Sequence, residues 1–109
     1  LLVAVVPGLV KSNSFRHPGR LYLSSERLCF RSQVLGMEAQ FSIPWTTVEW
    51  ARMVATEEKS MHPVRIVLKG PTRFDGGDVT CFDVRLFDAG ALAYLHNCCS
   101  YFVGTGLFD

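Results

Sequence analysis

Two short runs, each with an apolar residue at every second position, follow one another in the segment Gly19-Arg-Leu-Tyr-Leu-Ser-Ser-Glu-Arg-Leu-Cys-Phe-Arg-Ser32. Leu21 and Leu23 lie two residues apart before the Ser-Ser-Glu sequence, and Leu28 and Phe30 lie two apart after it. Because side chains alternate between the faces of a strand, these four share one apolar face. The opposite face carries Arg20, Tyr22, Arg27, Cys29 and Arg31. The segment therefore predicts a half-buried antiparallel hairpin with its turn at Ser-Ser-Glu.

Similar alternation predicts further strands on both sides of this hairpin. Glycine and proline mark the predicted breaks at Pro7-Gly8, His17-Pro18-Gly19 and Pro44-Trp45, and a long loop is expected over residues 70–78. The predicted strands cover residues 1–6, 9–15, 20–24, 27–31, 39–43, 48–54, 64–68 and 80–86. About six or seven of these segments are expected to form one antiparallel sheet.

The apolar spacing changes from two to three and four after residue 88. Leu92, Leu95, Cys99 and Phe102 recur at this spacing, which predicts an amphipathic helix capped by Asp88 and ended before Gly104. A single apolar helix at the end of a twisted sheet covers the open end of that sheet. The sequence thus predicts a mainly β (α+β) fold, a β-sandwich or partly open barrel of about seven antiparallel strands capped by one C-terminal α-helix.

The composition sets limits on the class of protein. With 109 residues, 49% hydrophobic, 19% charged and a net charge of +1, we predict one globular domain over residues 1–109. The near-neutral charge disfavours nucleic acid as a partner. The four cysteines do not form metal-binding spacings, which favours reduced thiols and a cytoplasmic location. Because the sequence starts at a leucine, we expect the domain to be excised from a larger protein.

The order of these elements and four short motifs resemble the GRAM domain, a member of the pleckstrin-homology-like superfold. The resemblance covers residues 8–103. The motifs are Gly19-Arg-Leu-Tyr-Leu-Ser24, Leu28-Cys-Phe-Arg-Ser32, Phe41-Ser-Ile-Pro-Trp45 and Phe82-Asp-Val-Arg-Leu-Phe87. The resemblance implies a non-catalytic membrane-targeting module of membrane trafficking, peripheral at membranes, that binds phosphoinositide or other anionic lipid headgroups. The alternative is a protein–protein or intramolecular docking domain without lipid binding, within a larger Rab-GTPase-activating, phosphatase or lipid-transfer protein.

A lipid headgroup site needs several cations that converge on a compact anion. Most of the candidates bracket the first predicted loop, where pleckstrin-homology domains commonly gather basic ligands, and alternation places one more on the same face. The candidate lipid-binding residues are Lys11, Arg16, His17, Arg20 and Arg31. Phe15 is the candidate for insertion into the membrane interface.

Each of these assignments has a structural alternative. The cations also suit a solvated outer sheet face, with Glu26 near enough to pair with Arg20 or Arg27. Ordinary burial tendencies favour Phe15 as a core residue at a strand end over membrane insertion. The three histidines do not adjoin a nucleophile in any catalytic motif, so we predict no enzyme activity and no cofactor.

Overall fold

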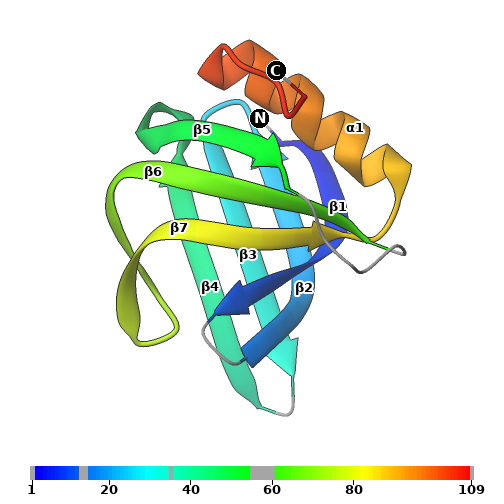
Figure 1. Cartoon of the computed structure of the whole chain (residues 1–109). Coiled ribbons are helices and arrows are strands. Elements are labelled where there is room, and N and C mark those ends of the chain that lie inside the picture. Colours follow the sequence, from blue (N-terminus) through cyan, green and yellow to red (C-terminus); the bar gives the residue numbers. More distant parts are fainter. Residues whose placement is uncertain (1, 13–14, 35, 55–60, 109) are drawn as a thin grey trace.

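A computed structural model describes residues 2–12, 15–34, 36–54 and 61–108, without the side chains of Ser12, Phe15, Val34 and Met37. Seven antiparallel strands form one sheet in the order β4-β3-β2-β1-β7-β6-β5, and this sheet curls into a partly open barrel (Figure 1). The strands are β1 (Leu2–Ser12), β2 (Phe15–Ser24), β3 (Arg27–Val34), β4 (Met37–Pro44), β5 (Val48–Met53), β6 (His62–Phe74) and β7 (Gly77–Leu86). The predicted mainly β architecture is confirmed.

Helix α1 (Ala89–Cys98) covers one end of the barrel and continues into the π-helical turn η2 (Cys99–Val103). Asp88 caps α1 as predicted, because its Oδ1 accepts a hydrogen bond from the Ala91 N–H at 2.7 Å. Gly104 ends the helical segment with a φ of 93°, a left-handed conformation that glycine adopts without strain. The short 3₁₀ helix η1 (Trp45–Thr47) makes the predicted bend between β4 and β5.

The hairpin read first from the sequence is β2–β3. Its four apolar residues are at most 1% exposed and lie in the core that the sheet and α1 enclose: Leu21, Leu23, Leu28 and Phe30. Ser24 Oγ accepts hydrogen bonds from the backbone N–H groups of Glu26 and Arg27, which fixes the predicted turn. Alternation therefore placed both faces of this hairpin correctly.

Two predicted breaks in the first strands are wrong. β1 runs through Pro7-Gly8, and β2 runs through His17-Pro18-Gly19, so the chain reverses only between β1 and β2. Gly8 and Gly19 are directly opposed in the two strands. A Cβ at Gly19 would lie only 2.2 Å from the Arg31 carbonyl oxygen, so glycine serves a close approach of strands there rather than a turn.

The predicted long loop over residues 70–78 is also wrong. β6 continues to Phe74, and the turn consists of Asp75 and Gly76, both with positive φ, as in a two-residue hairpin. The pairing of β6 with β7 changes register from Val67 to Thr72. The intervening part of β6, which contains Gly70 and Pro71, bulges out of the ladder. Thr80, at the start of the strand predicted over residues 80–86, is exposed, whereas Phe82, Val84 and Leu86 are buried.

Candidate functional site

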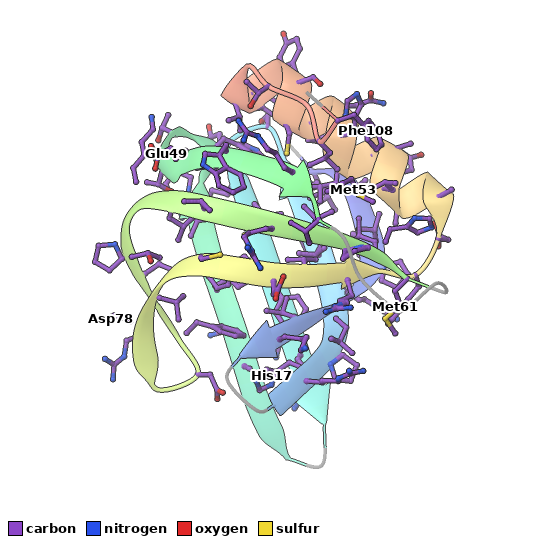
Figure 2. The ribbon with its side chains drawn as sticks, viewed as in Figure 1. His17, Glu49, Met53, Met61, Asp78 and Phe108 are labelled. Carbon is purple, nitrogen blue, oxygen red and sulfur yellow. The ribbon has the colours of Figure 1, made fainter. Side chains whose placement is uncertain are left out.

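The end of the barrel opposite α1 is its mouth, where β1 and β3 end, β2 and β4 begin, and the β6–β7 turn lies (Figure 1). Figure 2 shows His17 toward this end and Phe108 beside the helix at the other. Four aromatic rings from four strands fill the interior below the mouth, with centroid separations of 4.0–6.3 Å. They belong to Phe30, Phe41, Phe74 and Phe82. One of them, Phe74, also contacts the ring of His17.

Four of the five predicted lipid-binding residues lie on the outer face of the sheet. Lys11 and Arg16 are partners in the β1–β2 register, and Arg20 and Arg31 are partners in the β2–β3 register. The two pairs are separated by about 13 Å along β2, at the usual rise of a strand. The structure therefore groups them as two pairs of cations rather than as one cluster.

His17 lies on the other side of β2. Its ring is in edge contact with Phe74 at 5.5 Å, and its Nε2 is 3.2 Å from Asp75 Oδ2 in the β6–β7 turn. The side chain is only 13% exposed. Geometry thus joins His17 to a carboxylate at the mouth and separates it from the outer arginines. The side chain of Phe15, the predicted membrane-insertion residue, lies outside the described residues.

Two arginines near the mouth each lie beside a carboxylate. Arg31 forms an ion pair with Glu38 at 3.1 Å, and Arg73 lies 3.7 Å from Asp78. All four side chains are about half exposed or more, so these pairs contribute little to stability and exchange readily with other anions. The sequence suggested Glu26 as the acidic partner of Arg20 or Arg27 and named none for Arg31. The β3–β4 register, which opposes Gln33 to Glu38, places Glu38 diagonally beside Arg31.

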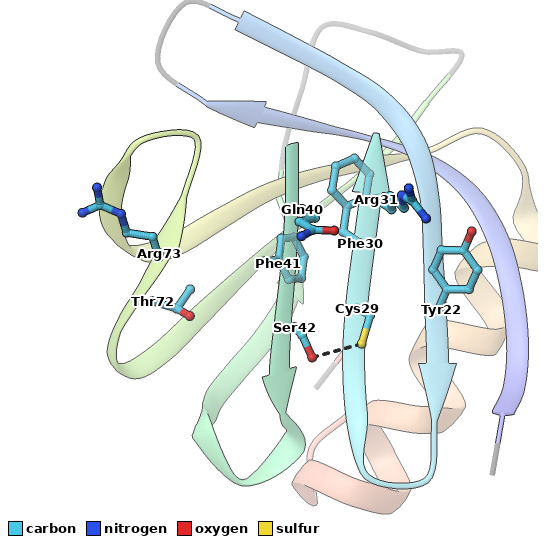
Figure 3. A pocket seen from close by; sticks show the side chains of 9 residues that line it. All are labelled: Tyr22, Cys29, Phe30, Arg31, Gln40, Phe41, Ser42, Thr72 and Arg73. Carbon is cyan, nitrogen blue, oxygen red and sulfur yellow. Dashed lines mark hydrogen bonds between the residues drawn. The ribbon is translucent and has the colours of Figure 1, made fainter. Parts of the chain in front are cut away.

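Three adjoining hollows form a groove over the outer face of β2, β3 and β4. The largest has a volume of about 660 Å³, and its neighbours have about 360 and 120 Å³ (Figure 3). The first two share Tyr22 and Arg31, and the first and third share Ser42 and Thr72. The largest hollow is lined by Tyr22, Cys29, Phe30, Arg31, Gln40, Phe41, Ser42, Thr72 and Arg73. We call these joined hollows the outer groove.

Sequence reasoning missed the part that Arg73 plays in the outer groove. Arg73 was assigned to a loop because residues 70–78 are rich in glycine, proline and aspartate. The Asp75-Gly76 dipeptide between two runs that can form strands was the signal that a short hairpin, with Arg73 on it, occurs here.

Three of the four cysteine thiols are poorly suited to nucleophilic chemistry. All four cysteines are free. Burial raises the pKa of Cys98, and burial with the neighbouring Cys98 raises the pKa of Cys99 to about 12. Desolvation also raises the pKa of Cys81, and this outweighs the opposing effect of Arg65. These thiols stay protonated at neutral pH. The described residues also lack any His, Cys, Asp and Glu group suited to a metal ion.

Comparison with known proteins identifies the family. The GRAM domain family model matches residues 6–69, more than half of the chain. The chain belongs to the GRAM domain family. GRAM domains are non-catalytic and are linked to membranes, lipids and protein interactions in general. The matched residues run from β1 into β6, and so include both pairs of outer cations.

The structure of this GRAM domain is also similar to a solved structure, the crystal structure of the C-terminal domain of an unknown protein from Leishmania infantum. The TM-score is 0.70 at 14% sequence identity, over 94% of this chain and 84% of that chain. At this identity the similarity supports the fold alone. A search of curated proteins found no match. Among the described residues, helices long and apolar enough to cross a membrane are absent.

Proposed function

We propose that this GRAM domain is a cytoplasmic, peripheral membrane-targeting module that binds phosphoinositide or other anionic lipid headgroups. The observation that carries the proposal is the pairing of Lys11 with Arg16 and of Arg20 with Arg31 on one face of the sheet. Two pairs of adjoining cations on one face attract partners that carry several anionic groups. A membrane rich in phosphate groups supplies such anions at both pairs.

Exposed apolar side chains on β1 also support a membrane contact through the outer face of the sheet. Leu2, Val3 and Val5 are 43–56% exposed. Val5 is opposite Tyr22 and Pro7 is opposite Arg20 in the register, so apolar residues and cations adjoin on the outer face. This combination suits the interface of a bilayer, where apolar groups enter the acyl boundary and cations meet phosphate.

Co-sedimentation with liposomes tests the proposal. Vesicles of phosphatidylcholine alone are compared with vesicles that also contain phosphatidylserine or a phosphoinositide, across a salt series. We expect binding only to the anionic vesicles, and a steep loss of binding as salt rises, because the contacts are exposed and screened. Comparison of the two anionic lipids separates headgroup recognition from general attraction.

The decisive variant reverses three outer charges, Lys11→Glu, Arg16→Glu and Arg20→Glu, and should abolish the sedimentation. Its matched control carries Arg52→Glu, Arg65→Glu and Lys69→Glu on β5 and β6, which changes the net charge equally. If the two variants lose binding equally, the membrane contact is not on β1–β2. A second set with glutamine in place of glutamate keeps the test valid if charge reversal unfolds the hairpin.

Protein docking is the second candidate function, and exposed aromatic residues near the helix favour it. Tyr94 is 52% exposed, Tyr101 is 83% exposed and Phe108 is 64% exposed. Tyrosine is enriched among the residues that dominate protein interfaces. The absence of any lipid response in the liposome assay would favour this function over membrane binding.

A further inference from the structure

The outer groove combines positive charge with a lining free of carboxylates. Arg20, Arg31 and Arg73 line it, and its other described lining residues are polar, apolar or glycine. Glu38 and Asp78 reach two of these arginines but do not line the groove. An entering carboxylate would therefore meet guanidinium groups in two of the three hollows, without direct repulsion from their lining.

An incompletely paired strand forms part of the same groove. Within the described residues β4 is an edge strand with β3 as its hydrogen-bonded neighbour. The largest hollow extends from Gln40 and Ser42 of β4 to Thr72 and Arg73 of β6, across the free edge of β4 (Figure 3). The backbone of an edge strand offers N–H and C=O groups that an added strand can bond.

The shape of the groove favours a peptide over a membrane. The segment of β6 from Thr72 to Phe74, with β7 after it, forms a ribbon that makes one wall of the largest hollow (Figure 3). A flat bilayer can contact the exposed side chains of Arg20 and Arg31, but it cannot follow the bottom of the hollow beside this wall. An extended chain, about 3.3 Å long per residue and narrow, can lie along the bottom.

We propose that the outer groove binds an extended acidic peptide segment of a partner protein. The peptide adds along the edge of β4, and its carboxylates meet Arg31 and Arg73 in place of Glu38 and Asp78. This inference goes beyond membrane binding, because it uses Arg73, Tyr22 and the edge of β4 rather than Lys11 and Arg16. Charge complementarity supports the partner's acidic character, and the free edge supports its extended conformation.

A synthetic octapeptide of alternating glutamate and valine, labelled with fluorescein, tests the proposal. Alternation with valine favours an extended conformation. We expect saturable binding with a Kd below about 1 mM, and NMR shift changes centred on β3, β4 and the distal half of β6. The double variant Arg31→Gln/Arg73→Gln should weaken binding about tenfold, because it removes two charge-assisted contacts.

The matched control is Arg52→Gln/Arg65→Gln, which removes two arginines that are also cross-strand partners but do not line the groove. It should bind the peptide as the parent does. Equal binding of a peptide with glutamine in place of glutamate would overturn the proposal. So would shift changes outside the groove, or an equal loss of binding in the control. Liposome binding by Arg31→Gln/Arg73→Gln, measured in parallel, separates failure here from failure of the membrane proposal.

Discussion

The helix-covered end of the barrel and its mouth are built from different interactions. At the helix end, Trp45 stacks on Phe102 at 5.6 Å, and Leu107 is 2% exposed. Two hydrogen bonds fix the position of Leu107 after the helix. The Met53 N–H donates to the Leu107 carbonyl, and the Leu107 N–H donates to His96 Nδ1. Apolar burial and backbone bonds therefore stabilise this end together.

The mouth has a buried aromatic layer below an exposed charged rim. Side-chain pairs at the rim join parts of the chain that are far apart in the sequence, such as His17 of β2 and Asp75 of the β6–β7 turn. Exposed ion pairs such as Arg31–Glu38 contribute on the order of 0–1 kcal/mol each. The difference indicates a division of roles. The helix end carries the stability, and the rim tolerates changes of charge that alter binding.

The largest expected effect is at the helix end, in Leu95→Ala. Leu95 is 0% exposed and belongs to the central core. Removing its side chain leaves a cavity, and we expect the free energy of unfolding to fall by about 2–5 kcal/mol. Urea denaturation followed by tryptophan fluorescence measures this loss. A decrease as small as that from Asp75→Asn at the rim would contradict the division of roles.

An intermediate effect should depend on pH. The pKa of Cys99 is raised from 9.0 to about 12, mainly by burial, so the unfolded chain loses its proton before the folded chain does. The contribution of Cys99 to stability is complete below pH 9 and is lost as the pH rises towards 12, by about 1.4 kcal/mol per unit. Denaturation between pH 8 and about 10.5 should show a smaller decline for Cys99→Ala than for the parent. Parallel declines would indicate that Cys99 is not buried as described.

The smallest effect on stability is expected at the rim, in Glu38→Gln. This change removes the exposed ion pair with Arg31 and should alter the free energy of unfolding by less than about 1 kcal/mol. Because it leaves Arg31 without that carboxylate, acidic-peptide binding should strengthen about two- to threefold. Glu49→Gln on β5 is the control of equal charge change and should leave peptide affinity unchanged. Equal strengthening in both variants would show that only net charge matters.

Alternation was sufficient to predict the hairpin, the core and the capping helix. Leu21, Leu23, Leu28 and Phe30 are buried because a two-residue period places side chains on one face in any half-buried strand. Asp88 and Gly104 occur where helices begin and end for local reasons. These predictions depended on neighbours in the sequence alone.

Glycine and proline led to wrong predictions of turns and loops, because their structural role depended on strands far away in the sequence. Gly19 was assigned to a turn, yet it allows the close approach of the Arg31 carbonyl on β3. Arg73 was assigned to a loop, yet it lines the outer groove because β6 bulges and continues past Gly70-Pro71. The carboxylate partner of Arg31 was not predicted for the same reason, since Glu38 adjoins Arg31 only through the strand register.

The sequence by itself determined the order of elements and the apolar face of the β2–β3 hairpin, because these follow from short-range periodicity and local capping. Its motifs indicated the family by their resemblance to GRAM domains. Only the tertiary structure divided the predicted cations into two pairs on the outer face and placed His17 beside Asp75. It also formed the outer groove between β4 and the bulge of β6. Such features depend on register, sheet curvature and close contacts between strands far apart in the chain, which a pattern of neighbouring residues does not encode.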